Sequence, residues 1–92
     1  MKYRIELTPK AEENLLALRR SGDKARIKKV FRFFEELTVH PYEGTGKPEA
    51  LTGDYSGYWS RRINLKDRLI YKVIDEVITV LVVQIGQHYE DK

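Results

Sequence analysis

The sequence predicts an α+β domain in which a helical hairpin packs on one face of an antiparallel β-sheet, in the order β-α-α-β-β-β. Two observations predict this fold. The first half of the chain holds two amphipathic helical segments with start and stop signals, and the second half holds three apolar, β-branched segments separated by short polar turns. A chain of 92 residues supports one modest core, so residues 1–92 are expected to form a single domain.

The chain begins with a predicted strand that leads directly into a helix. Residues 2–7 (KYRIEL) alternate charged and apolar side chains, as a half-buried strand does. Thr8 can accept hydrogen bonds from the free amides of a first helical turn, and Pro9 fits the first helical position. The apolar positions of this helix are Ala11, Leu15 and Leu18.

A second helix is expected after a break at residues 21–23. Gly22 suits the position that follows a helix, and Asp23 is a typical N-cap for the next one. The helix should end before Pro41, because the residue before a proline is pushed out of the helical region. Its apolar stripe is predicted to be Ile27, Val30, Phe31, Phe34 and Leu37. The short joint between the helices predicts an antiparallel hairpin.

The second half of the chain is predicted to be a long loop followed by a meander of three strands. The loop covers residues 41–57, a length that usually marks a functional or disordered segment. The last strand is apolar on both faces and should lie inside the sheet, whose face away from the helices is expected to be open. The strands are predicted at residues 58–65, 68–74 and 77–85, with turns at 66–67 and 75–76.

Charge and composition limit the class of protein without naming its partner. The net charge of +3 is mild, but bases outnumber acids between residues 47 and 72, which fits either a polyanion partner or a solvated sheet face. The absence of cysteine removes disulfides and thiolate zinc sites. No apolar run approaches the ~18–20 residues that span a bilayer, and no signal peptide is evident. A soluble, cytoplasmic protein without a membrane partner is expected.

Three groups are candidates for chemistry: Glu49 in the loop, Arg68 at a strand start, and His88-Tyr89 after the last strand. Each alone is usually an ordinary surface residue, but the topology lets all three converge over the open face. Cleavage of RNA through its own 2′-OH needs a base, a cation for the phosphate and an acid for the departing 5′-oxygen. Glu, Arg and His fit these roles, and the reference pKa of His, ~6.5, suits an acid. Tyr89 could stack on a base or donate to a phosphate.

Other kinds of site find no support in the sequence. The two histidines, His40 and His88, lie far apart without a partner at metal-binding spacing, and the GTGKPE segment lacks the rest of a phosphate-binding loop. No serine stands in a nucleophile elbow. We therefore expect neither a metal nor a cofactor. Trp59 is interpreted as a core or interface residue, with base stacking as the alternative.

Four stretches resemble the Txe/YoeB family of toxins within the RelE-like superfamily of bacterial toxin–antitoxin systems: PYEGTGKPEAL, SGYWSRRI, DRLIYKV and the terminal HY. The resemblance covers nearly the whole chain and implies a RelE-like fold. It also implies an mRNA interferase that cleaves mRNA in the ribosomal A site. By this resemblance Glu49 is the general base, Arg68 stabilises the phosphate, His88 is the general acid and Tyr89 positions the scissile phosphate.

The resemblance also implies binding residues and partners. Lys47, Arg61 and Arg62 are expected to bind RNA, with a structural partner as the alternative for one of the two arginines. The partners are mRNA and the ribosome, a cognate antitoxin whose flexible tail folds onto the toxin, and a second copy of the chain as a homodimer. Two readings from other classes stay open: a non-catalytic inhibitor of a protein target such as gyrase, like the ParE-type toxins, and an RNA-binding module that does not cut.

Overall fold

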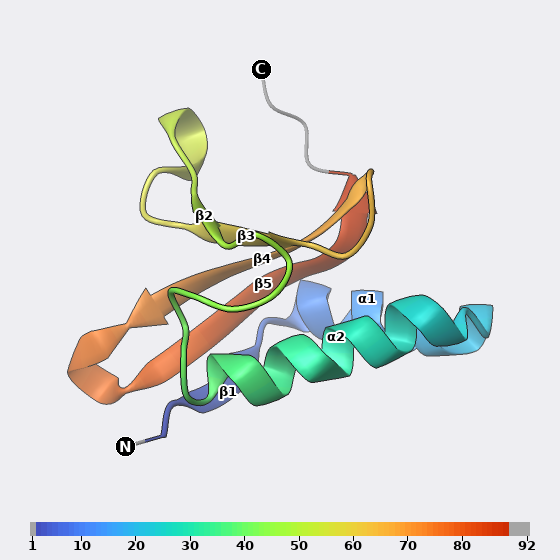
Figure 1. Ribbon diagram of the computed structural model, residues 1–92, viewed down its shortest axis with the longest axis horizontal. Coiled ribbons are helices and arrows are strands. Elements are labelled where there is room, and N and C mark those ends of the chain that lie inside the picture. The colour runs from blue at the N-terminus through green and yellow to red at the C-terminus, as the bar shows by residue number, and fades with distance from the viewer. Residues whose placement is uncertain (1, 89–92) are drawn as a thin grey trace.

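The structure, a computed structural model, describes residues 2–88, with side chains as far as residue 86. Its five strands form one sheet in the order β1-β5-β4-β3-β2. Both helices pack against the same face of this sheet (Figure 1). The elements are β1 (Arg4–Leu7), α1 (Pro9–Ser21), α2 (Lys24–Leu37), β2 (Glu49–Ala50), β3 (Trp59–Arg62), β4 (Asp67–Ile74) and β5 (Thr79–His88), with short 3-10 helices at Gly53–Tyr55 and Asp75–Val77.

The helix boundaries confirm the capping signals of the sequence. Thr8 Oγ1 accepts a hydrogen bond from the Ala11 amide at 3.1 Å, and the helix starts at Pro9. Gly22 ends α1 in the left-handed conformation, with φ of 72°, which costs a glycine little. Asp23 Oδ1 then accepts from the Arg26 amide at 3.2 Å and starts α2.

The sheet is mixed, whereas the sequence analysis expected an antiparallel one. β3, β4 and β5 form the predicted antiparallel meander, and β5 lies inside the sheet as predicted. β1, however, pairs with β5 in parallel, Arg4 standing opposite Thr79 and Leu7 opposite Val82. A parallel neighbour needs a connection that crosses from one end of the sheet to the other, and here the chain between Leu7 and Thr79, which holds both helices and the strands β2, β3 and β4, supplies it.

Side chains of α1 cover the edge of β5 where β1 ends. Thr8 Oγ1 donates to the Val83 carbonyl at 3.3 Å, and Asn14 Oδ1 accepts from the Ile85 amide at 3.1 Å. Asn14 is a buried polar residue, and its hydrogen bond to the Ile85 amide explains why it lies there. A buried backbone amide without an acceptor is costly.

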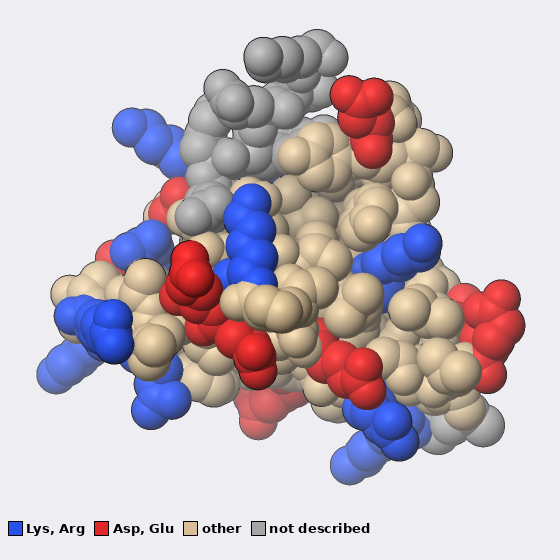
Figure 2. Space-filling model, turned by 180° about the vertical axis from the view of Figure 1, so that it is seen from behind, with Lys and Arg blue, Asp and Glu red and all other residues tan. Residues whose placement is uncertain are grey.

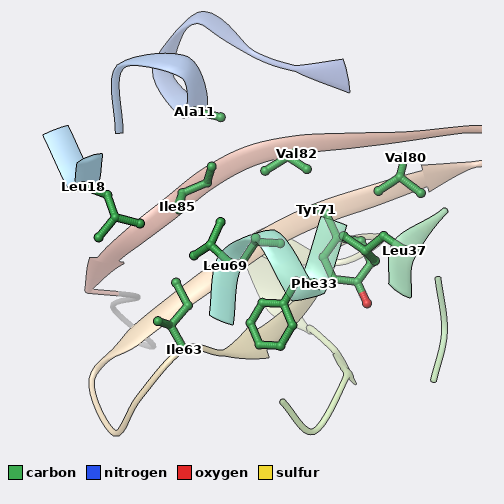
Figure 3. Packing of buried hydrophobic residues seen from close by; sticks show 11 residues of the cluster. Ala11, Leu18, Phe33, Leu37, Ile63, Leu69, Tyr71, Val80, Val82 and Ile85 are labelled. Atoms are coloured by element: carbon green, nitrogen blue, oxygen red, sulfur yellow. The ribbon is translucent and has the colours of Figure 1, made fainter. Parts of the chain in front are cut away.

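The core lies between the two helices and the middle of the sheet (Figure 3). Ala11 and Leu18 of α1 face β5, while the α2 side chains face β4 and the β3–β4 hairpin. The predicted stripe of α2 was wrong at one position: Phe33 is fully buried, and Phe31 is 41% exposed. Periodicity alone does not separate neighbouring phenylalanines at the border of an apolar stripe. Phe33 is the buried one because the segment after α2 folds over it, with Gly46 against its ring.

Three predicted boundaries are corrected by the structure. Residues 41–57 are not a bare loop, because they contain β2 and a 3-10 helix. The first meander strand stops at Arg62, and residues 63–66 form the bend, so Asp67 opens β4 instead of lying in a turn. The last strand starts at Thr79, because Asp75–Val77 form a 3-10 helix and Ile78 is left-handed, with φ of 47°.

A buried arginine joins the segment after α2 to the sheet. Arg61 of β3 has no exposed surface, and its three guanidinium nitrogens all donate hydrogen bonds. Their acceptors are Glu36 Oε1 (2.7 Å), the carbonyls of His40 (2.8 Å), Glu43 (2.8 Å) and Thr45 (3.3 Å), and the Tyr71 hydroxyl (3.3 Å). The expectation that Arg61 binds RNA is therefore wrong, because a side chain without exposed surface cannot reach a phosphate. Its role is structural.

The Glu36 carboxylate is the anionic partner of this arginine. Burial alone would raise its pKa. Hydrogen bonds from the Thr45 amide and hydroxyl and from Arg32, together with the charge of Arg61, outweigh burial and lower the pKa of Glu36 below its ordinary value of 4.5. The ionised form is thus the one that the fold stabilises.

The first prediction concerns Arg61. Replacing Arg61 by Ala should lower the free energy of unfolding by about 3–5 kcal/mol, because it leaves a half-buried carboxylate and three carbonyls without a donor. Urea denaturation followed by circular dichroism measures the loss. The adjacent, exposed Arg62 is the matched control, and Arg62→Ala should stay within about 0.5 kcal/mol of wild type. Equal losses in the two variants would contradict the structural role of Arg61.

The second prediction concerns the pH dependence of Glu36. Because folding lowers its pKa, the stability it adds is fully present above pH 4.5 and is lost as the pH falls through the lower folded value. Glu36→Gln should be less stable than wild type at pH 7. The difference in stability between the two proteins should become smaller below pH 4.5. Melting temperatures of both proteins between pH 7 and pH 3 test this, and a gap that widens in acid would refute it.

Candidate active site on the far face of the sheet

Glu49 is placed on the sheet by β2, the short edge strand. It pairs opposite Ser60 of β3, which pairs opposite Ile70 of β4. Residues paired in this way share a face of the sheet. Ile70 is absent from the core cluster that contains its neighbours Leu69 and Tyr71, so this row lies on the far face, meaning the face of the sheet away from α1 and α2.

The far face is less open than the sequence analysis expected. Ile70 is fully buried and Ser60 is 2% exposed, so the centre of the face is covered. Glu49, by contrast, is exposed at the edge. The described residues give its carboxylate neither an ion pair nor a hydrogen bond, which leaves it available to a ligand.

Arg68 lies near Glu49 on the same face, at the start of β4. It is two residues before Ile70 and pairs opposite Arg62 of β3. Its Nη1 atom contacts the carbonyls of Asn64 (3.3 Å) and Leu65 (3.4 Å) in the hairpin bend. Two cations directly opposite one another destabilise a sheet, and an anion bound between them removes that repulsion.

The sheet register fixes the distance between Glu49 and Arg68. Glu49 and Arg68 are separated by two strand spacings across the sheet and two residues along it, which places their Cα atoms roughly 12 Å apart. Among the described residues no ion pair joins the two side chains. A gap of this size suits a group held between them, such as a phosphodiester.

His88 is the last residue of β5, and its backbone pairs opposite Asp67, beside Arg68. β5 thus brings the backbone of His88 to the strand that carries Arg68. The side chain of His88 and the whole of Tyr89 lie outside the described residues, so the predictions for both stay predictions.

Lys47 and Arg62 line one shallow depression beside the β3–β4 hairpin. The depression is completed by Lys29 of α2, Gly46, Ile63, Asn64 and Leu65. Lys47 has a left-handed backbone, with φ of 51°, which is uncommon for a residue with a side chain. Sequence reasoning did not single out Lys29, although it lies in the basic run of α2; the depression is what distinguishes it from Lys28.

The surface carries no broad field of one sign on the side seen in Figure 2. Among the described residues, acidic and basic side chains lie close together over the lower part of that side (Figure 2). On the far face Lys72 makes a cation–π contact, since its Nζ lies 5.5 Å from the centroid of the Tyr58 ring. Electrostatic attraction for a polyanion therefore rests on particular residues, chiefly Arg62, Arg68 and Lys47.

Trp59 packs as a structural residue in this arrangement. Its ring lies 5.2 Å from that of Tyr42, and it is partly buried against the core cluster. The Tyr42 hydroxyl donates to Asp75 at 2.7 Å, and this bond to a carboxylate raises the pKa of Tyr42 to about 12. The contacts of Trp59 agree with its interpretation as a core or interface residue.

The described residues contain neither a membrane-crossing helix nor a cluster of metal ligands. Over residues 2–88 neither helix has the length and apolar character of a membrane-crossing segment. Within the same range no three His, Asp or Glu side chains gather as metal ligands do.

Comparison with known proteins places this chain in a family. The sequence model of the family described as YoeB-like toxin of bacterial type II toxin-antitoxin system matches residues 8–89. Toxin YoeB of Streptomyces coelicolor is 43% identical over 68 residues, which cover 74% of this chain and 79% of that protein.

Two solved structures from Staphylococcus aureus share the fold. One is a heterotetrameric complex of the YoeB-YefM toxin-antitoxin, with 32% identity and a TM-score of 0.81. The other is a YoeB dimer, with 32% identity and a TM-score of 0.82. Each similarity covers 97% of this chain and 100% of the other. The chain belongs to the family of YoeB-like toxins of bacterial type II toxin–antitoxin systems.

Proposed function

We propose that this toxin is an endoribonuclease that cleaves mRNA in the A site of the ribosome and so inhibits translation. The observation that carries the proposal is the far face itself, where an exposed, unpaired carboxylate at Glu49 stands across from the facing arginines Arg62 and Arg68. Membership in the YoeB-like family supports the same conclusion and does not favour a gyrase inhibitor.

The reaction needs no group beyond the chain and the RNA. The Glu49 carboxylate takes the proton of a ribose 2′-OH, whose oxygen attacks the adjacent phosphorus. Arg68 binds the phosphate oxygens on which charge accumulates, and its planar guanidinium can contact two of them at once. His88 gives a proton to the departing 5′-oxygen, and Tyr89 positions the scissile phosphate. The products are a 2′,3′-cyclic phosphate and a new 5′-hydroxyl end.

The exposure of Glu49 has a consequence for this role. In water a glutamate is a weak base, because its reference pKa is ~4.3. A carboxylate that loses its surrounding water becomes a stronger base, and bound RNA can cover the exposed side chain of Glu49. The ribosome-bound mRNA therefore acts as part of the active site, since it supplies the desolvation that the free protein lacks.

The proposed partners follow from the substrate and from the relatives. Lys47 and Arg62, which line one depression beside the β3–β4 hairpin, bind the RNA backbone. A cognate antitoxin occupies the toxin until it is released, by analogy with the complex of YoeB and YefM, and a homodimer forms by analogy with the YoeB dimer. An activity on translating ribosomes belongs in the cytoplasm.

The third prediction tests the catalytic assignment. Glu49→Gln and His88→Ala should each slow cleavage by about 10²–10⁴-fold, which is the usual contribution of a general acid or base. Primer extension on mRNA from a reconstituted translation reaction measures this as the loss of discrete 5′ ends at A-site codons. Glu43→Gln is the matched control, because it removes the same charge from an exposed position of the same segment.

Two results would count against the assignment. Cleavage by Glu49→Gln at the wild-type rate would remove Glu49 from the reaction. Intact mRNA with the wild-type protein would sink the nuclease proposal as a whole and would redirect attention to protein targets.

The fourth prediction concerns RNA binding by Arg62. Arg62→Ala should weaken binding and lower the slope of log K against log salt concentration by about 0.7, the value for one lost phosphate contact on a single strand. The measurement uses ribosomes programmed with mRNA that carries a 2′-deoxy nucleotide at the scissile position, so that binding occurs without cleavage. Arg20→Ala, an equal loss of charge on α1, should leave the slope unchanged. An unchanged slope with Arg62→Ala would exclude the contact.

A further inference from the structure

Arg26 of α2 bridges two carboxylates that belong to different parts of the chain. Its Nε donates to Asp23 Oδ2 at 2.9 Å, and its Nη1 donates to Asp67 Oδ2 at 2.9 Å. The second contact is long-range and shielded from water, since the two side chains are only 26% and 20% exposed. The Arg26 guanidinium is therefore partly buried and held by two carboxylates.

Asp67 in turn shapes the bend of the β3–β4 hairpin. Its Oδ2 also accepts from Asn64 Nδ2 at 3.1 Å, and its carbonyl accepts from the Ile63 amide at 2.9 Å. Asn64 Oδ1 accepts from the amides of Lys66 (2.9 Å) and Asp67 (2.7 Å). The bend is thus a compact unit bonded within itself, and Arg26 is its ion-pair link to α2.

The catalytic Arg68 follows this bend directly and rests on it. Its Nη1 atom contacts the carbonyls of Asn64 and Leu65, at 3.3 and 3.4 Å. A displacement of the bend must therefore displace the guanidinium of Arg68. Since Asp67 precedes Arg68 in the chain, the anchored carboxylate and the catalytic cation move together.

Arg26 also approaches β5 just before its end. Gly86 is left-handed, with φ of 73°, and lies near the place where the pairing of β4 with β5 shifts register. A Cβ built on Gly86 would lie 3.8 Å from Arg26 Nη1. Two residues later, His88 pairs opposite Asp67. Arg26 thus lies at the junction of α2, the start of β4 and the end of β5.

We propose that Arg26 and Asp67 are positioning residues for the cleavage reaction: their ion pair fixes the hairpin bend on α2 and so aligns Arg68 with the end of β5. This inference rests on the proposed nuclease function. It assigns no RNA contact to either residue. A displacement of about 1 Å at a reacting group can lower the reaction rate about 10²-fold, so loss of this ion pair can have a measurable effect on cleavage.

The test separates positioning from binding and from folding. Arg26→Ala, Asp67→Ala and the double variant are compared with wild type in the reconstituted translation reaction, with the toxin concentration varied. Each single variant should lower the saturating cleavage rate by about tenfold or more, with the half-saturating concentration within about twofold of wild type. The double variant should be no slower than the singles, because both remove one shared interaction.

Two controls complete the design. Lys24→Ala removes a charge from the same helix end without breaking any contact of the hairpin, and it should cleave at the wild-type rate. Arg26→Lys keeps the positive charge and one nitrogen that donates hydrogen bonds. It should recover part of the cleavage rate that Arg26→Ala loses, and its melting temperature should equal that of the wild-type protein. Hydrogen exchange of the Lys66 and Asp67 amides should quicken in Arg26→Ala by about tenfold, which reports the freed bend without any reference to cleavage.

The outcomes distinguish this inference from the function on which it rests. If the wild-type protein leaves mRNA intact, the nuclease proposal fails, and the positioning role fails with it. If wild type cleaves and Arg26→Ala cleaves equally fast, only the positioning role is overturned. The same holds if the rate losses of the two single variants add in the double variant, or if amide exchange in the bend is unchanged.

Discussion

The buried guanidinium of Arg61 is the interaction on which the arrangement of the far face depends. A charge with no exposed surface is stable inside a protein only when hydrogen bonds satisfy its donors and a counter-charge lies nearby. Here the carboxylate of Glu36 and the backbone carbonyls of residues 40, 43 and 45 supply the acceptors. The segment after α2 therefore has one way to fold, and it delivers Gly46, Lys47 and Glu49 to the edge of the sheet.

Two neighbouring arginines of β3 lie on opposite faces of the sheet, one buried and one exposed. Successive residues of a strand point to opposite faces, so Arg61 enters the core while Arg62 faces the solvent opposite Arg68. The same alternation puts Tyr71 beside the buried arginine, where burial raises the pKa of its hydroxyl, and Ile70 on the side of Glu49. Two adjacent positions of identical chemistry thus acquire different roles from strand geometry alone.

Local signals in the sequence predicted most of the elements. Thr8, Gly22 and Asp23 fixed the ends of the helices because caps depend on a few neighbouring atoms. The parallel pairing of β1 with β5 was missed because partners 75 residues apart leave no trace in local periodicity. β2 escaped notice because two residues are too short for any pattern, and the strand is defined only by its pairing with β3.

For the candidate site, the sequence predicted the face that Glu49 and Arg68 share but not which of the two adjacent arginines is buried. Glu49 and Arg68 were predicted to share a face, and the register places them there. The burial of Arg61 could not be chosen over that of Arg62, because a strand with two arginines gives no sign of which face is the core. The bridge from Arg26 to Asp67 was likewise not predicted, since Asp67 was expected in a turn and Arg26 lies outside the predicted apolar stripe of α2.

The edges of the sheet determine how readily this protein can pair with another chain. Past the end of β1, the exposed backbone of β5 would be a template for a foreign strand, and the Thr8 and Asn14 side chains occupy it instead. The strands left at the borders are short: β2 has two residues, and β1 has four, with Arg4 and Glu6 among them. Short and charged borders resist the strand-to-strand association that leads to aggregates. Helix side chains that mimic a missing strand therefore serve as a safeguard of solubility as well as a detail of packing.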